Sequence, residues 1–169
     1  CVAWGCKAVA GGLAALLLAL SGCAGYDGRG LVPGQSTSSE VDKLMGPAQD
    51  KRAGPNGETV LWYPRLPAGR VSYAARIGQD DRLIAVEQRL TEANVARLQP
   101  GVSRGSDVLD LLGPPYRVEK FARLERDIWS YPADGITPKL ILVQLSKDGV
   151  VREAYFIEDP NAGAPDGYE

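Results

Sequence analysis

The spacing of apolar residues predicts a short amphipathic helix around residue 41. Val41, Leu44 and Met45 lie at i, i+3 and i+4, so they share one helix face. Gly46 suits the left-handed conformation that often follows a helix, and Pro47 prevents the helix from continuing. A helix of two or three turns is marginal by itself in water. We therefore expect this face, including Leu44, to be buried against other elements of the same unit.

The same pattern occurs a second time, 67 residues further along the chain. Of the 17 positions from 31 to 47, nine are identical to their counterparts at this offset, whereas ordinary composition gives about one match by chance. Trp62 and Trp129 also coincide. Such a repeat indicates two copies of one structural unit, with Leu111 buried in the same way as Leu44. The repeat is marked by Gly34, Leu44, Gly46 and Trp62 in the first copy and by Gly101, Leu111, Gly113 and Trp129 in the second.

Runs with strand character follow each repeated helix. They cover residues 60–63, 71–77 and 83–88 in the first unit and 127–131, 139–145 and 150–157 in the second. A further helix is expected over 91–98, where Thr91 is placed to cap apolar positions at helical spacing. The predicted fold class is α+β, with two tandem units in which short helices pack on a three-stranded antiparallel sheet.

The first 22 residues are expected to lie outside the fold. Residues 8–20 form an uncharged apolar run of 13 residues, a length typical of a signal peptide rather than of a transmembrane helix. The segment ends in Leu20, Ser21, Gly22 and Cys23, which resembles the lipobox of bacterial lipoproteins. This resemblance implies cleavage before Cys23 and lipidation of that cysteine. The alternatives are an ordinary secretory signal or an N-terminal anchor.

The rest of the chain divides into four predicted segments. They are a flexible tether over 23–30, a first unit over 31–89, a second unit over 90–158 and a disordered tail over 159–169. Ala24 takes the place of the aspartate that retains lipoproteins in the inner membrane. By analogy with lipoprotein sorting, the protein is expected on the outer membrane, lipid-anchored and facing the periplasm.

Charge and reactive side chains limit the function classes. Loss of residues 1–22 removes one lysine, so the net charge changes from −2 to −3, and no basic surface for nucleic acid is expected. The chain has no histidine, which excludes Ser–His and Cys–His catalysis. The adjacent Asp80 and Asp81 are more typical of a turn than of a metal site. We therefore expect no catalytic residue, no metal, no cofactor and no small-molecule substrate.

A set of residues in the second unit matches the pattern of a known family. They are Leu90, Thr91, Asn94, Val95, Leu98, Gly101, Ser103, Val108, Leu111, Leu112, Gly113, Pro115, Trp129 and Tyr131, followed by the strand 140–145 and the turn Asp148-Gly149-Val150. In these residues the chain resembles the BamE (SmpA/OmlA) family of outer-membrane lipoproteins. The first unit is similar as a more diverged copy. The resemblance implies short helices on a three-stranded antiparallel sheet, an arrangement that also occurs, in tandem, in the β-lactamase inhibitor fold.

The function that this resemblance implies is non-enzymatic. The protein would act as a scaffold or accessory in the assembly of β-barrel outer-membrane proteins, through contacts with protein components of the assembly machinery. An alternative is an inhibitor-like periplasmic module that docks an enzyme on a concave sheet. A third class is a ligand-binding or hydrolytic domain, which a deep pocket with converging carboxylates would favour.

Two loops that differ between the units are the expected partner surface, because loops on a rigid scaffold often carry function. They span residues 64–70 and 132–139, and each starts at a Tyr-Pro pair. Trp62 and Trp129 are expected to cover the core between helix and sheet, with an aromatic anchor at an interface as the alternative. The candidate contact residues are Tyr63, Arg65, Arg70, Tyr131, Asp134 and Lys139.

Overall fold

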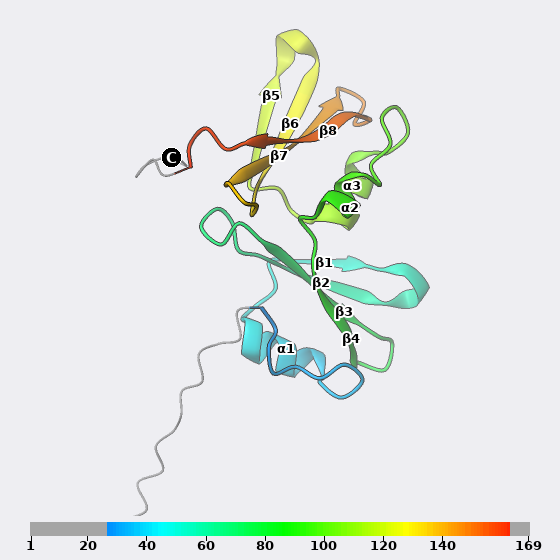
Figure 1. Ribbon diagram of the computed structural model, residues 1–169. Helices are drawn as coiled ribbons and strands as arrows, with labels where there is room; N and C mark the ends of the chain where they lie inside the picture. Colours follow the sequence, from blue (N-terminus) through cyan, green and yellow to red (C-terminus); the bar gives the residue numbers. More distant parts are fainter. Residues whose placement is uncertain (1–26, 163–169) are drawn as a thin grey trace, which may run out of the picture.

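The computed structural model describes residues 27–162, which form two units that each contain a four-stranded antiparallel sheet (Figure 1). The chain is an α+β protein with a tandem arrangement, as the sequence predicts. The predicted signal peptide (1–22), its lipobox residues Leu20, Ser21 and Gly22, and the lipidation site Cys23 lie outside the described residues. No helix within residues 27–162 is long and apolar enough to cross a membrane.

The first unit consists of one helix and one sheet. Helix α1 (Ser38–Met45) is followed by β1 (Asp50–Ala53), the 3-10 turn η1 (Pro55–Gly57), β2 (Thr59–Pro64), β3 (Ser72–Ile77) and β4 (Leu83–Gln88), and the four strands are neighbours in sequence order. A capping box starts α1. The Thr37 side chain accepts a hydrogen bond from the Glu40 N–H, and the Glu40 carboxylate accepts one from the Thr37 N–H at 2.7 Å.

The second unit repeats this plan with one helix more. It consists of α2 (Glu92–Val95), α3 (Gly105–Leu112), β5 (Arg117–Phe121), the 3-10 turn η2 (Ala122–Leu124), β6 (Arg126–Ala133), β7 (Lys139–Ser146) and β8 (Val151–Glu158), again with the strands in sequence order. The Thr91 hydroxyl accepts a hydrogen bond from the Asn94 N–H at 3.2 Å and caps α2, as its position predicts.

The repeated Pro-Gly-x-Ser turn has the same role in both units. The Ser36 hydroxyl accepts a hydrogen bond from the Val32 N–H at 3.0 Å, and the Ser103 hydroxyl accepts one from the Gln99 N–H at 2.9 Å. The carbonyl of each serine accepts a bond from the last strand of its unit at 2.8 Å. The turn therefore fixes the start of the helix against the edge of its own sheet.

The prediction of three strands in each sheet is wrong, because a further strand precedes the predicted ones in both units. The missed strands, β1 and β5, lie at sheet edges and have the mostly polar sequences DKRA and RVEKF. Every residue of β5 is exposed. A strand without a buried face gives no apolar alternation from which it can be predicted.

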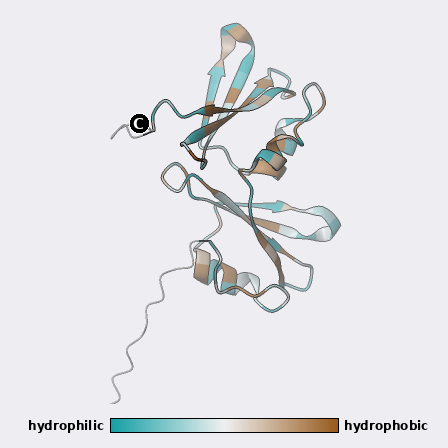
Figure 2. Ribbon diagram, in the orientation of Figure 1, coloured by the Kyte–Doolittle hydropathy of each residue, from teal (hydrophilic) through white to brown (hydrophobic). Residues whose placement is uncertain are grey.

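Each sheet packs one face, here termed its inner face, on the helices of its own unit. The first core contains Val41 and Met45 of α1, and Leu44 beside them is only half-buried. Its counterpart Leu111 is buried, so the burial expected for both leucines is confirmed for Leu111 alone. The reason is that α3 is covered on a second side by the first unit, whereas α1 lies at the end of the molecule (Figure 1). Figure 2 shows the apolar residues of α1 and α3.

The elements form four layers, in the order α1, first sheet (β1–β4), α2 with α3, and second sheet (β5–β8) (Figure 1). The helices of the second unit thus lie between the two sheets. The first unit also starts earlier than predicted, because Gly28 of the expected tether is buried, and a Cβ atom there would lie 3.1 Å from Cγ2 of Val86.

The two repeated tryptophans lie on opposite faces of their sheets. Trp129 packs with Tyr131 in the core of its own unit, as expected. Trp62 lies outside the first core, which contains its neighbours Leu61 and Tyr63, so it projects from the other, outer face. The second unit has one additional residue, Ser130, between tryptophan and tyrosine. A shift of one residue moves a side chain to the opposite face of a strand, so the prediction of equivalent roles is wrong for Trp62.

Candidate functional site

Two of the predicted contact residues are buried. Tyr63 is 1% exposed and Tyr131 is 0% exposed. The Tyr63 hydroxyl donates to the Asp42 carboxylate at 2.8 Å, and the Tyr131 hydroxyl donates to the Gly113 carbonyl at 3.1 Å. Burial raises the pKa of both phenols above the ordinary value of 10. Both tyrosines therefore belong to the cores of their units and not to an exposed surface.

The remaining predicted residues also contribute mainly to internal contacts. The Arg65 guanidinium donates to the Met45 carbonyl at the end of α1. The Lys139 ammonium lies 3.7 Å from the Glu92 carboxylate. Of the six candidate residues, Asp134 is fully in the exposed class. The loops after the Tyr-Pro pairs therefore connect elements of this chain to one another, which the sequence prediction did not anticipate.

Arg70 connects the two units. Its guanidinium lies 2.9 Å from the Asp159 carboxylate and donates to the Ala133 carbonyl at 3.2 Å and to the carbonyl of Lys139. The Asp159 side chain is 0% exposed, and it also accepts a hydrogen bond from the Asn161 N–H at 3.0 Å. Asp159 is the first residue of the segment predicted to be a disordered tail, so this part of the segment is ordered.

The outer face of the first sheet is covered by the end of α3. Trp62 is fully buried, and its ring lies so close to Gly113 that a Cβ atom there would be 2.4 Å from Cε3 of the indole. The Arg89 guanidinium donates to the carbonyl oxygens of Asp110 at 2.9 Å and Leu111 at 3.2 Å. These are carbonyls of the last helical turn, where cations are favourable. The face therefore holds a helix end through one aromatic ring and one cation.

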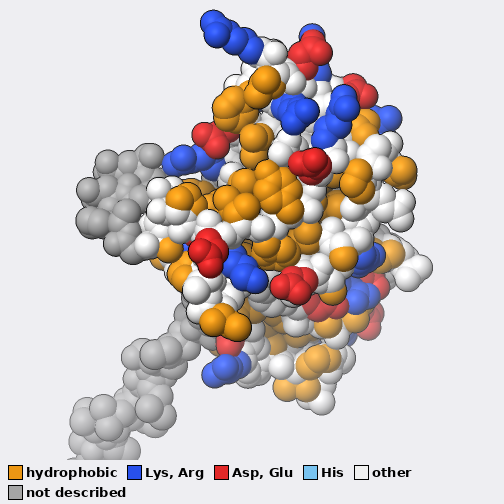
Figure 3. Space-filling view, turned by 45° about the horizontal axis from the view of Figure 1, so that its top comes forward, with side chains coloured by type: hydrophobic (Ala, Val, Ile, Leu, Met, Phe, Trp, Pro, Cys, Tyr) orange, Lys and Arg blue, Asp and Glu red, His pale blue; other side chains and the backbone are white. Residues whose placement is uncertain are grey.

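The outer face of the second sheet has no such cover within residues 27–162. Helix α1 packs on the first sheet, and α2 and α3 pack on the inner face of the second. Alternation with the core residues of β6, β7 and β8 places six side chains on the outer face. They are Ile128, Ser130, Leu140, Leu142, Tyr155 and Ile157. Figure 3 shows hydrophobic side chains gathered over the second unit, with charged side chains around them.

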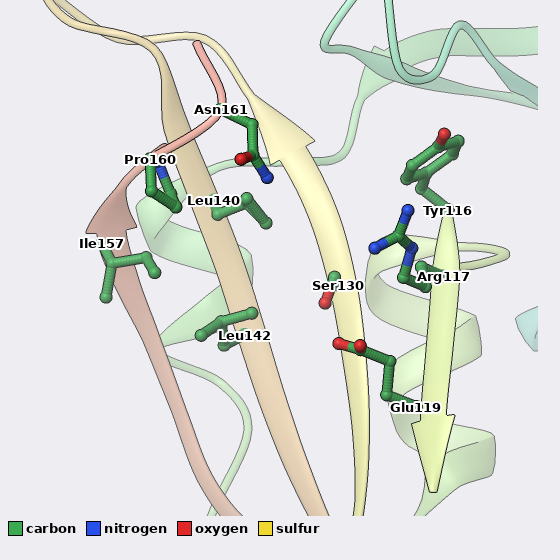
Figure 4. A pocket seen from close by; sticks show the side chains of 9 residues that line it. All are labelled: Tyr116, Arg117, Glu119, Ser130, Leu140, Leu142, Ile157, Pro160 and Asn161. Atoms are coloured by element: carbon green, nitrogen blue, oxygen red, sulfur yellow. The ribbon is translucent and has the colours of Figure 1, made fainter. Parts of the chain in front are cut away.

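A hollow of about 170 Å³ lies in the middle of this face (Figure 4). Ser130, Leu140 and Leu142 form its floor, and α3 lies behind the sheet in this view. Its rim includes Arg117 and Glu119 of β5, as well as Ile157, Pro160 and Asn161 on the opposite side. The hollow is called the Ser130 hollow below.

The equivalent positions of the two sheets explain the Ser130 hollow. Tyr63 and Tyr131 are the matching core residues, so Ser130 occupies the outer-face position that Trp62 has in the first sheet. In the registers of the two sheets, Trp62 faces Ala74 and Ser130 faces Leu142. The second sheet has thus lost the large central ring and gained an apolar neighbour.

The sequence contains a signal for this face that the prediction did not use. In β7, Leu140 to Val143 are four consecutive apolar residues. Such a run is typical of a strand with both faces covered, whereas the second sheet of an isolated protein needs only one. The chemistry of the Ser130 hollow is that of apolar recognition, since Glu119 is the one carboxylate among the described residues that line it. Within residues 27–162 no group of three or more His, Cys, Asp or Glu residues is placed to hold a metal ion.

Comparison with known proteins gives one distant similarity. No protein-family model and no curated protein matches the chain. A solved structure of YjgB, a DUF4309 family protein from Bacillus subtilis, is similar over 77% of this chain and 82% of that chain, with 17% sequence identity and a TM-score of 0.29. The resemblance to the BamE family therefore stays a prediction from the sequence.

Proposed function

We propose that the protein is a non-enzymatic adaptor that binds a protein partner on the outer face of its second sheet. The observation that carries this proposal is an apolar sheet face without a covering layer. The matching face of the first sheet is covered by a helix end. Ile157 on the second sheet is 37% exposed, and the apolar floor around Ser130 is open to a hollow of about 170 Å³.

The energetic argument follows from the size of the face. Complete burial of a leucine or isoleucine side chain stabilises a complex by roughly 1.5–3 kcal/mol. Leu142, Tyr155 and Ile157 are partly exposed in the free protein, so a partner that covers them gains several such contributions in part. Charged groups such as Arg117 and Glu119 stand at the margin, which is the usual anatomy of a protein interface.

The sequence supports a cellular setting for this adaptor. The lipobox before Cys23 supports a lipid anchor, and Ala24 after it supports the outer membrane with the protein facing the periplasm. The BamE-like residues support components of the β-barrel assembly machinery as the partners. The inhibitor-like alternative requires a concave surface on an enzyme-binding sheet, and the same outer face of the second sheet would serve it.

The experiment that tests the proposal is affinity capture from detergent-solubilised envelopes, followed by mass spectrometry. Leu142→Arg places a charge in the middle of the face, and Val102→Arg places the same charge on a turn residue that is 68% exposed. We expect β-barrel assembly components to be captured by wild-type protein and by Val102→Arg, but not by Leu142→Arg. Thermal unfolding of all three proteins controls for stability.

Three outcomes would contradict the proposal. The first is capture of the same assembly components by Leu142→Arg and wild type, and the second is capture of none by wild type. The third is capture of a soluble periplasmic enzyme whose rate falls on binding, which would favour the inhibitor-like alternative. Hydrolysis of a substrate by the purified protein, lost on neutralising a single carboxylate, would favour the third class.

A further inference from the structure

The first sheet provides an internal example of what this type of face binds. Its occupant is the C-terminal end of α3, held against Trp62 by close packing at Gly113. The Arg89 guanidinium donates to two carbonyls of the last turn of that helix. The occupant is therefore a helix end that lies on the face of a sheet. It is not an extended segment added to a sheet edge, which is the other common way in which sheets bind peptides.

The second sheet presents the inverse shape at the equivalent position. Where the first sheet has the ring of Trp62, the second has Ser130 and a hollow of about 170 Å³. A buried apolar cavity of about 150 Å³ is large enough to bind benzene. The Ser130 hollow therefore accommodates one aromatic ring or one large aliphatic side chain. Since the sheet has no ring of its own at this point, the occupant must supply it.

A second copy of the chain does not supply a suitable helix. Helix α1 is the described helix with a free outer side, and that side carries exposed Asp42 and Lys43. At the repeat offset, Asp42 stands where α3 has Leu109. Burial of these charges against Leu142 would cost more free energy than apolar contact returns. Phe121 and Leu124 at the β5–β6 turn are exposed, but they belong to a 3-10 turn and its flanks and not to a helix.

Resting on the proposed function, we infer that the partner contributes an amphipathic helix to this face, and that one aromatic or large aliphatic side chain of this helix enters the Ser130 hollow. Among the described residues that line the hollow, the charged ones are one cation, Arg117, and one carboxylate, Glu119. Their charges balance, so apolar fit selects the partner and net charge does not. Binding is therefore expected to change little with salt, because screening acts on charge–charge attraction.

The first test uses two substitutions at Ser130 in the full lipidated protein. Ser130→Leu fills the hollow from within, whereas Ser130→Ala leaves it open. Capture of the assembly component is measured over a dilution series of immobilised bait. We expect Ser130→Leu to weaken capture about 10- to 100-fold, the range for one large apolar side chain that loses its burial, and Ser130→Ala to leave it unchanged. Equal capture by both variants would overturn the inference.

The second test identifies the occupant directly. A photoreactive benzoylphenylalanine is introduced at position 142 of the full-length protein in its own cells, with position 102 as the control. Crosslinked peptides are then sequenced. We expect the crosslink at position 142 to lie in a partner segment with apolar residues at i, i+3 and i+4, and to be absent at position 102.

The other outcomes separate this inference from the proposed function. A crosslink to an extended segment of an assembly component overturns the helix and leaves the adaptor proposal intact. A crosslink to a second copy of this chain, to its own residues 163–169 or to lipid overturns the inference and the partner assignment together. No crosslink at position 142 in cells where the component is captured overturns the use of this face.

Discussion

The contact between Trp62 and Gly113 predicts a large effect of one added methyl group. Gly113 follows α3 with φ +82°, a left-handed conformation, and a Cβ atom there would lie 2.4 Å from Cε3 and 2.6 Å from Cζ3 of the Trp62 indole. Real Cβ atoms do not approach other atoms so closely. Gly113→Ala therefore forces either the indole or the end of α3 to move, and the indole is fully buried.

A matched control separates the two costs of this substitution. Gly46 follows α1 with φ +86°, and a Cβ atom there would have nothing within 4 Å. Gly46→Ala therefore carries only the conformational cost of a left-handed alanine, about 1–2 kcal/mol. Gly113→Ala carries the same cost and an overpacking cost of about 1–3 kcal/mol. The difference between the two variants measures the contact between the units.

The assay is urea unfolding of the purified proteins, followed by circular dichroism and by tryptophan fluorescence. We expect Gly113→Ala to lose about 1–3 kcal/mol more than Gly46→Ala. In a Trp62→Ala background this excess should disappear, because the double-mutant cycle removes the shared contact. Equal losses for Gly113→Ala and Gly46→Ala in the wild-type background would refute the packing of α3 on the first sheet.

Three further predictions concern ionic contacts and the anchor. The hydrogen bond from Arg76 lowers the pKa of Glu58 below its ordinary value of 4.5, so its stabilisation is present above that value and is lost as the pH falls through the folded-state pKa; Glu58→Gln should flatten this acid dependence of the urea midpoint, and an unchanged profile would contradict it. Arg70→Met leaves the buried Asp159 carboxylate without its ion pair and should cost about 3–5 kcal/mol in urea unfolding, whereas a loss under about 1 kcal/mol would show that the pair is not formed. Cys23→Ala should release the protein from salt-washed membranes or leave its precursor uncleaved, and normal processing with membrane retention would contradict the lipobox.

Much of the fold could be predicted because it depends on local patterns. The strand predicted over 83–88 has the bounds observed for β4, since apolar residues alternate with polar ones there and a turn precedes them. The helix ends follow from Gly46 and Gly113, which take positive φ values as their positions indicate. The edge strands β1 and β5 could not be predicted, because their side chains are not sorted into buried and exposed faces.

The site was harder to predict because it depends on how the units pack. The offset of 67 residues aligns Trp62 with Trp129, yet the residue after each tryptophan decides which face it occupies. Recognising the additional Ser130 would have required the Tyr-Pro pairs, at an offset of 68, to be preferred to the tryptophans as anchors. The Arg70–Asp159 contact joins residues 89 apart, and no local pattern encodes such a distant pair.

The Arg70–Asp159 pair has a mechanical consequence. The units are joined once by the short chain segment between β4 and α2, and a second time by this buried pair on the loop after β2. A body joined at one point can swing, whereas two separate points of attachment prevent rotation about either. For a protein held at Cys23, a pull on the second sheet then reaches the membrane end as tension along the chain and not as bending between the units. The partner face keeps a constant direction relative to the point where the chain enters the first unit.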